Sequence, residues 1–342
     1  MDKNIEIKRI VIPGLDILKF IMSLLIVAVH SEAVNDIPIV YEVTNPIINS
    51  AVPMFFVVSA FLLFRKMRQS QLTFHQERGI MLHFTWRLIL LYVFWMVVQL
   101  PLVIHTRHYL SMSFFEFIYN FLLDIAFRST FHGAWFFSAL VVGTWLIYFA
   151  SKMLKDKTIW ILPLFVALYI YHADDLPVQY QTFWFLYQEN VINPQNSFLV
   201  SLFWISAGFI LANPDIIEKM ENLRNSYVMG GLFCIAWLLS IMLLDLRVFM
   251  VLSLFALFYN WKLESKPIYK MMRQSSILIF TLHFLFIGIF RMVCPTVEIL
   301  QHGLILYVVL VIMCLLSSYV IMKLKDYKLF SLSLIHISEP TR

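Results

Sequence analysis

Ten apolar windows separated by more polar segments restrict the fold of this chain more than any other feature of its sequence. Hydrophobic residues make up 61% of the 342 residues and charged residues only 14%, whereas soluble domains are typically about 45 to 50% apolar. A helix needs about 20 apolar residues to cross a bilayer. The chain is therefore predicted to be an all-α integral membrane protein with about ten transmembrane helices. The windows lie at 11–31, 47–64, 85–104, 133–150, 158–172, 197–212, 227–244, 247–261, 275–293 and 303–322.

The positions of the basic residues test this number independently, because cytoplasmic loops of membrane proteins carry an excess of Lys and Arg. With ten spans and a cytoplasmic N-terminus, twenty basic residues fall in cytoplasmic segments and only Arg107, Arg128, Arg247 and Arg291 in the opposite loops. The alternation predicts that both termini are cytoplasmic, and it counts Arg273 among the loop residues. The net charge of +5 is thereby explained by topology, so no nucleic-acid partner is expected.

Several segments need separate interpretations. The windows at 158–172 and 247–261 are short, and their limits are open. Residues 109–131 are amphipathic and are predicted to form an interfacial helix and loop. Residues 1–330 are predicted to be a single membrane domain, and 331–342 a disordered or non-native tail. A cleavable signal peptide over residues 1–30 is the alternative for the first window, but its removal would spoil the alternation of the loops.

The first window carries Asp16, Lys19 and His30 within otherwise apolar sequence. Lys19 and His30 are eleven positions apart, which places both side chains within about 20° of the same helix face and about 16 Å apart in depth. Because an ionisable residue in a bilayer is costly, such residues normally face a bundle interior or a water-filled cavity. This face is a candidate functional site. The structural alternative is an ion pair between Asp16 and Lys19 within one helix.

Five further polar or aromatic residues lie in or beside the windows. Ser59 lies in the second window, Arg87 opens the third, His132 and Trp135 open the fourth, and His283 lies halfway along the ninth. Packing, snorkelling to the interface and interhelical hydrogen bonds are the structural alternatives. For the mid-span His283, a functional role in proton handling or substrate contact and a structural interhelical hydrogen bond are equally compatible with the sequence.

Some kinds of chemistry have no support in the sequence. The three cysteines form no CxxC pair, so neither a disulfide framework nor a metal site is expected. The chain has no Walker motif, no GxGxxG run and no HExxH motif. Energy coupling through bound ATP is therefore not expected.

Four short motifs occur in order along the chain and give a resemblance that none gives alone. They are Leu15-Asp16-x-Leu18-Lys19 with His30 eleven positions on, Val-Pro-x-Phe-Phe-x-x-Ser ending at Ser59, the His132 and Trp135 start of the fourth window, and Ile-x-x-Leu-His ending at His283. Together they resemble the membrane acyltransferase-3 family, which O-acylates sugars and cell-surface polymers. The resemblance covers residues 9–325.

The resemblance implies roles for particular residues. Lys19 and His30 match the family's basic-x10-His motif, which is associated with catalysis. Arg87 looks like one member of the family's arginine pair. Phe84 stands where the other member is expected, and His83 is the nearest basic residue.

Two smaller departures concern other motifs. Ala60 follows Ser59 where the family usually has glycine, and two residues rather than the commoner one separate His132 from Trp135. These departures affect the predicted contacts with the donor more than the assignment of His30.

The resemblance also implies a reaction. The donor would be a cytoplasmic acyl-CoA, acetyl-CoA by default, and the acceptor a hydroxyl of an extracytoplasmic or lipid-linked glycan of the cell envelope, with the protein in a bacterial cytoplasmic membrane. His30 would act as general base or transient acyl carrier, Lys19 would orient or stabilise charge, Asp16 would hold Lys19, and His283 would be a second proton-handling group. The remaining candidates are Arg87, Arg65 and Lys66 for the donor's phosphates, and Ser59, His132, Trp135 and Glu32 on the substrate side or in structural roles.

Other functions fit the same windows. A glycan or lipid-linked sugar transporter or flippase could line its path with the same polar face, although the two halves of the chain show no convincing repeat. The membrane part of a sensor or uptake module is a third possibility. The acyl group, the acceptor and the oligomeric state are left open by the sequence.

Overall fold

The structure is a computed structural model that describes residues 11–68, 72–107, 109–131, 133–222, 226–242 and 246–324. Every regular element among these residues is a helix. The described residues fall into two compact units, one made of those up to Val58 and from Pro214 onward, the other of Ser59–Asn213. Helix α3 (Ala51–Arg68) begins in the first unit and ends in the second.

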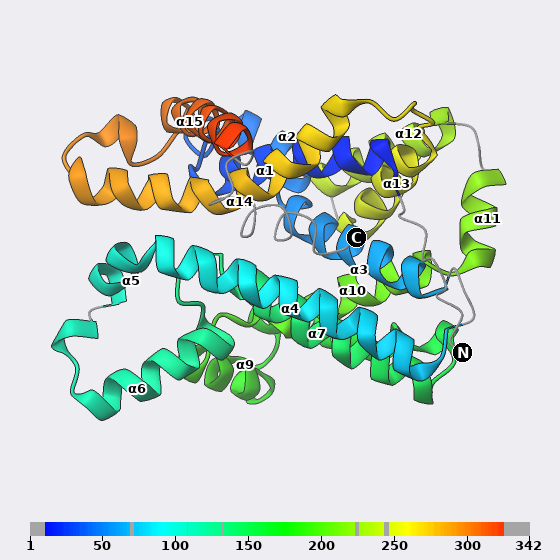
Figure 1. The fold of residues 1–342 in the computed structure, drawn as a ribbon, viewed down its shortest axis with the longest axis horizontal. Helices are drawn as coiled ribbons and strands as arrows, with labels where there is room; N and C mark the ends of the chain where they lie inside the picture. Colours follow the sequence, from blue (N-terminus) through cyan, green and yellow to red (C-terminus); the bar gives the residue numbers. More distant parts are fainter. Residues whose placement is uncertain are drawn as a thin grey trace. The chain divides into compact units, whose positions relative to one another are not determined.

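The first unit is built around α1 (Pro13–His30), which packs along α14 (Pro267–Val293) (Figure 1). Helix α1 also contacts α2 (Pro38–Ile48), α13 (Arg247–Asn260) and α15 (Leu304–Leu324). Helices α11 (Pro214–Asn222) and α12 (Ser226–Met242) pack on α13. A Cβ added at Gly14 would lie 1.9 Å from the Phe258 carbonyl oxygen, so only glycine allows α1 to approach α13 this closely.

The second unit is built around α7 (Trp135–Met153), which packs on α10 (Phe198–Leu211) and α4 (Phe74–Val98). Helix α10 also packs on α8 (Ile161–Tyr171). The close approach of α7 to α10 occurs at Gly143, where an added Cβ would lie 2.4 Å from Ile205 Cδ1. The unit also contains α5 (Leu100–Arg107), α6 (Phe114–Leu123) and α9 (Val178–Asn190).

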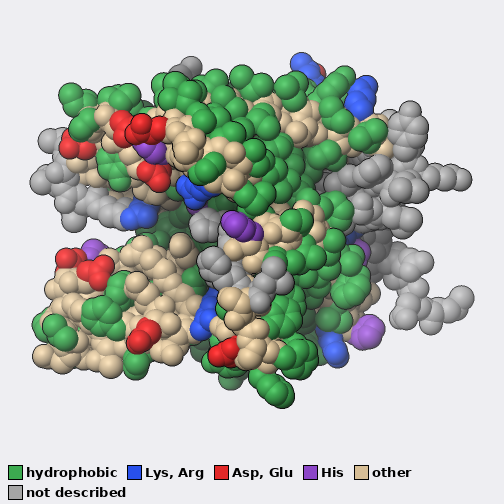
Figure 2. All heavy atoms as spheres, turned by 90° about the vertical axis from the view of Figure 1, so that its left-hand side faces the viewer, with side chains coloured by type: hydrophobic (Ala, Val, Ile, Leu, Met, Phe, Trp, Pro, Cys, Tyr) green, Lys and Arg blue, Asp and Glu red, His purple; other side chains and the backbone are tan. Residues whose placement is uncertain are grey.

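Helix α4 is apolar both on the face that packs inside the protein and on the face that is exposed. One face is buried and the opposite face is exposed, yet both are apolar, as expected where lipid replaces water. The buried side chains include Met81, Phe84, Leu88, Leu91 and Trp95, and the exposed ones Leu82, Trp86, Ile89, Leu90, Val93 and Val97. Large apolar areas of this kind are visible on the surface in Figure 2.

Six helices or continuous helix pairs in the described residues are long and apolar enough to cross a membrane, or seven if α10 and α11 are counted as one bent span. Each of the ten predicted windows coincides with a helix, but α8, α12 and α13 are among the shorter apolar helices. The prediction of a helical integral membrane protein is thus confirmed, with six or seven candidate spans in the described residues. The number ten and the cytoplasmic termini remain predictions.

Three helices lie where the sequence analysis predicts none, namely α2, α9 and α11. The predicted interfacial segment contains α6, whose ten residues are too few to cross a bilayer. The N-terminus before Val11 and the predicted tail at 331–342 lie outside the described residues.

Candidate functional site

A polar stripe runs along α1. Asp16, Lys19, Ser23, Ile26 and His30 recur every three or four residues, so they share one face of the helix. The first four of these side chains are buried, and His30 is half-buried at the last residue of the helix. Lys19 and His30 therefore lie on the same face of α1, as their spacing predicts.

Helix α14 carries a matching stripe with the same spacing. Arg273, Ser276, Phe280, His283 and Ile287 are all buried in the first unit. The sequence analysis counts Arg273 as a loop residue, and that is wrong, because α14 begins at Pro267, eight residues before the predicted window. The cytoplasmic side of Arg273 stays a prediction. Arg273 is a helix residue, and because its guanidinium is buried, this group needs a partner inside the protein.

That partner is Asp16. Arg273 Nη1 lies 2.9 Å from Asp16 Oδ2, and the two side chains are 4% and 1% exposed. Two opposite charges this deeply buried attract each other strongly, and removal of either one costs the other this attraction. The ion pair locks α1 to α14 at one end of their contact. It also gives Asp16 an interhelical role that an internal pair with Lys19 would not supply.

Two histidines meet further along the same helix pair. The ring centroids of His30 and His283 lie 5.4 Å apart with an interplanar angle of 31°. Phe284 packs beside both rings, with centroid distances of 4.5 Å to His30 and 3.9 Å to His283. Since Asp16 pairs with Arg273 and His30 with His283, α1 and α14 run in the same direction.

The backbone around His283 determines which of its ring nitrogens can accept a proton. His283 Nδ1 lies 2.9 Å from the carbonyl oxygen of Ile279, one turn earlier in α14. A carbonyl oxygen only accepts hydrogen bonds, so this geometry assigns the proton of the neutral ring to Nδ1. The lone pair then resides on Nε2, which makes His283 a base with a fixed orientation.

The second unit gathers cations at the end of α3 and on α4. Arg68 is committed to Asp156, with Nη2 2.8 Å from Oδ2, and its guanidinium lies 4.0 Å from the centre of the Phe209 ring. Lys66 and Arg87 interact electrostatically with each other and carry like charges. An anion bound between Lys66 and Arg87 would relieve this repulsion.

The other predicted site residues are dispersed. Ser59 is half-buried within α3, and Trp135 is half-buried at the first residue of α7. Glu32 is exposed in the turn after α1, with φ 53°. His132 lies outside the described residues.

The acyltransferase domain family model matches residues 12–323 of the chain. The chain belongs to the membrane acyltransferase-3 family. No curated protein and no solved structure matches it.

Family membership makes this protein an acyltransferase embedded in a membrane. In the described part of the first unit, the stripes of α1 and α14 bring together buried polar side chains, namely Asp16, Lys19, Ser23, Arg273, Ser276 and His283. No group of three or more His, Cys, Asp or Glu that could hold a metal ion occurs in the described parts of the chain.

The acyltransferase also departs from the family's arginine pair in a way that the structure explains. Phe84, at the position of the missing arginine, is 1% exposed and belongs to the apolar core of its unit. His83, the nearest basic residue, is exposed. Lys66 of α3 is a cation near enough to Arg87 for their charges to interact.

Proposed function

We propose that this acyltransferase moves an acyl group, acetyl in the simplest case, from cytoplasmic acyl-CoA to a hydroxyl of an extracytoplasmic or lipid-linked glycan. The observation that carries the proposal is the contact between His30, which is half-buried, and the buried His283, since two imidazoles in contact are suited to proton transfer. The protein is proposed to reside in a bacterial cytoplasmic membrane with both termini in the cytoplasm, as the distribution of basic residues favours.

In the proposed reaction, His30 removes the proton of the acceptor hydroxyl while the hydroxyl oxygen bonds to the thioester carbonyl carbon. The tetrahedral intermediate then loses CoA by cleavage of its carbon–sulfur bond, and the thiolate takes up a proton to leave as the free thiol. As an alternative within the same scheme, His30 carries the acyl group transiently. His283, with its lone pair on Nε2, receives or returns the proton.

Lys19 has a different role in this scheme. Eleven helical residues place it about 16 Å from His30 along α1, so the two side chains cannot act on the same reacting atom. We infer that Lys19 orients the extended donor or offsets its negative charge, at a deeper level than the thioester. The Asp16–Arg273 ion pair keeps the helix carrying Lys19 and His30 in register with the helix carrying His283.

The phosphates of the donor are proposed to bind to cations of the second unit. Arg87, Lys66 and Arg65 are the candidates, and Arg68 is a weaker one because Asp156 already neutralises it. The like charges of Lys66 and Arg87 support an anion site, since a phosphate placed there gains two favourable interactions and removes an unfavourable one.

The proposal is tested by release of free CoA thiol from acetyl-CoA by the purified protein, with and without a cell-envelope glycan extract. Wild type is compared with His30→Ala and with His172→Ala, which alters a histidine whose side chain is 60% exposed. We expect acceptor-dependent thiol release by wild type and His172→Ala, and its loss in His30→Ala at equal expression. Retained transfer by well-folded His30→Ala would refute the role of His30. Absence of thiol release by wild type with every donor and extract would refute the proposed reaction.

A further inference from the structure

The end of α1 that carries His30 closes in a defined backbone cap. Glu32 N–H donates to the Val29 carbonyl at 3.2 Å, and Ala33 N–H donates to the Ala28 carbonyl at 3.1 Å. With Glu32 at φ 53°, these two hydrogen bonds form a Schellman motif, whose left-handed position is usually occupied by glycine. A residue with a side chain adopts positive φ only uncommonly. The backbone that follows His30 is therefore held in a conformation that its own sequence does not favour.

Gly303 ties this helix end to the start of α15. Its N–H donates to the Ser31 carbonyl at 2.7 Å, and its own carbonyl accepts a hydrogen bond from Tyr307 N–H in the first turn of α15. The carbonyls at a helix end have no partner within the helix, and Ser31 is fully buried, so this bond satisfies a carbonyl that water does not reach. Gly303 adopts φ 93°, whereas a Cβ added there would meet Asp36 Oδ2 at an ordinary 3.5 Å. The backbone conformation, rather than a lack of space, therefore favours glycine at this position.

Two other contacts involve the turn between α14 and α15. Gln301 Nε2 donates to the Cys294 carbonyl at 2.8 Å, which joins the turn to the end of α14. His302 Nδ1 lies 3.7 Å from Asp36 Oδ2, and the two side chains are 44% and 70% exposed. An ion pair this exposed contributes little, because water screens it. The buried backbone hydrogen bond to Ser31 is thus the stronger link between the turn and α1.

The contact between α1 and α14 is therefore fixed at both ends. The buried ion pair between the two helices fixes one end. At the other end, His30 comes directly before Ser31, the residue whose carbonyl Gly303 holds. The last residues of a helix open easily unless other groups hold them. The position of the His30 ring against His283 thus depends on the hydrogen bond from Gly303.

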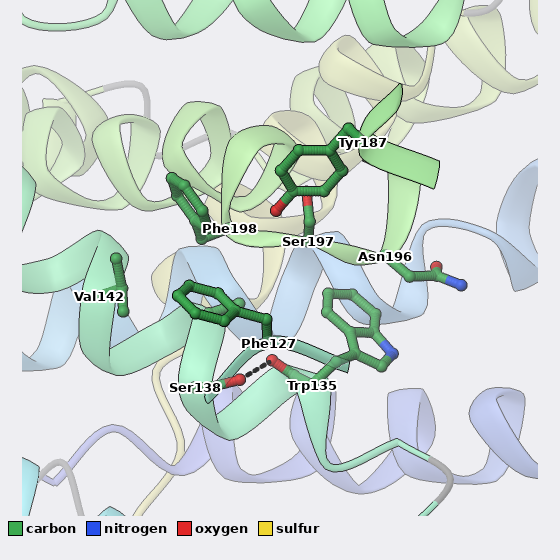
Figure 3. Close-up of a pocket in the computed structure, with 9 residues that line it drawn as sticks. Phe127, Trp135, Ser138, Val142, Tyr187, Asn196, Ser197 and Phe198 are labelled. Carbon is green, nitrogen blue, oxygen red and sulfur yellow. Dashed lines mark hydrogen bonds between the residues drawn. The ribbon is translucent and has the colours of Figure 1, made fainter. Parts of the chain in front are cut away.

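The second unit has a positive φ at a similar place. Ser129, just before α7, adopts φ 82°, and its hydroxyl oxygen accepts a hydrogen bond from the Trp135 N–H at 3.0 Å. Figure 3 shows Trp135 at the start of α7, where its carbonyl accepts a hydrogen bond from the Ser138 hydroxyl at 3.1 Å beside a cavity with room for about one water molecule. In the described parts of the chain, Glu32 and Ser129 are the non-glycine residues with positive φ, and each lies close to a residue of the family's motifs. Backbone strain of this kind clusters at functional sites.

We propose that Gly303 is a positioning residue for acyl transfer. Through its hydrogen bond to the Ser31 carbonyl it holds the end of α1, and this keeps the His30 imidazole in contact with His283. A side chain at position 303 makes the required φ unfavourable, so the turn shifts, the hydrogen bond weakens and His30 moves away from its partner. This inference deepens the proposed function and rests on it only for the catalytic role of His30.

The test compares Gly303→Asn, Gly303→Ala and Gly303→Val in the full chain in lipid nanodiscs. Asparagine tolerates positive φ best of the three, and the β-branched valine tolerates it worst. The matched controls are the same three substitutions at Gly231, an exposed position of α12 where an added Cβ meets nothing within 4 Å. One readout is the rate at which diethyl pyrocarbonate modifies His30, measured by peptide mass spectrometry without acyl-CoA and relative to the exposed His172. The other is kcat and KM for thiol release from acetyl-CoA at saturating acceptor.

We expect kcat to fall progressively from asparagine to valine in the Gly303 series, by about 10- to 100-fold for alanine, because small displacements of reacting groups are costly. The KM for acetyl-CoA should stay unchanged. His30 should become more reactive towards the reagent in the same order, while the Gly231 series matches wild type in both readouts. Gly303→Asn, the mildest change, keeps the test decisive if valine prevents folding.

Three outcomes would overturn the proposal. They are unchanged reactivity of His30 in the folded Gly303 variants, an equal response of the Gly231 series, and a more reactive His30 with unchanged kcat. If wild type releases no thiol, the proposed reaction fails, and the modification rates still decide whether Gly303 holds His30 in place.

Discussion

Arg273 Nη1 and Asp16 Oδ2 are 2.9 Å apart in a setting where neither side chain is more than 4% exposed, and 257 residues of sequence separate them. The pair links the first membrane helix to one of the last. Its burial makes it a determinant of stability rather than of surface charge, because the attraction between the two ions offsets part of the desolvation of each.

Removal of either partner should destabilise the protein by about 3 to 5 kcal/mol, since the remaining charge stays buried and loses this ion pair. The variants are Arg273→Met and Asp16→Leu, measured by the fraction of monodisperse protein that survives a series of heating steps. The double variant should recover most of the loss. Arg291→Met, at an exposed position of α14, serves as the control. Additive losses in the double variant would show that the two charges do not act as a pair.

His283→Phe should lower the rate of acyl transfer by about 100-fold or more, because the ring nitrogens are lost while an aromatic ring is kept among Phe280 and Phe284. The acetyl-CoA KM should change little. Thiol release at saturating donor and acceptor measures the effect. A variant that folds and transfers at the wild-type rate would restrict proton handling to His30.

Arg87→Gln and Lys66→Gln should each raise the KM for acetyl-CoA by about 10- to 100-fold, because a charge-assisted hydrogen bond contributes about 1.5 to 3 kcal/mol. The dependence of KM on ionic strength should also become shallower. Arg78→Gln, which removes an exposed cation from the same helix as Arg87, is the matched control and should leave KM unchanged. Equal effects of all three substitutions would point to a general electrostatic field and away from a phosphate site.

Gly14→Ala should destabilise the protein more than Gly143→Ala. The new methyl group at position 14 would meet the backbone carbonyl of Phe258, whereas at position 143 it would meet the terminal methyl of Ile205, which can rotate away. Overpacking of the second kind costs about 1 to 3 kcal/mol. The same heating series compares the two variants, and equal tolerance of both would contradict the close approach of α1 to α13.

Hydropathy predicted the positions of the ten long apolar segments well, because a helix surface needs apolar residues whether it is covered by lipid or by other helices. Each predicted window coincides with a helix, and the stripe from Asp16 to His30 follows from the helical repeat alone. Helices α2, α9 and α11 were missed. Helix α9 carries many polar residues and shows no helical amphipathicity, and α11 is mostly polar, so neither produces the signal of a span.

Arg273 shows why the candidate site could be predicted only in part. It stands two residues before an apolar window, where a basic residue normally marks the cytoplasmic interface, and nothing local reveals that its helix extends further and turns it inward. The contact between His30 and His283 is equally invisible in a single sequence, because each histidine follows its own helical pattern and the register between α1 and α14 is set by packing.

The separation of Asp16 from Arg273 has a consequence for the synthesis of the protein. At about 5 to 20 residues per second, the ribosome needs roughly 10 to 50 s to reach Arg273 after Asp16 has been made. During that interval the first helix carries an acidic group whose eventual partner does not yet exist. Over this interval only groups other than Arg273, such as Lys19 one turn away on the same helix, can offset the charge of Asp16, and a product truncated before α14 lacks the link between its first and later helices.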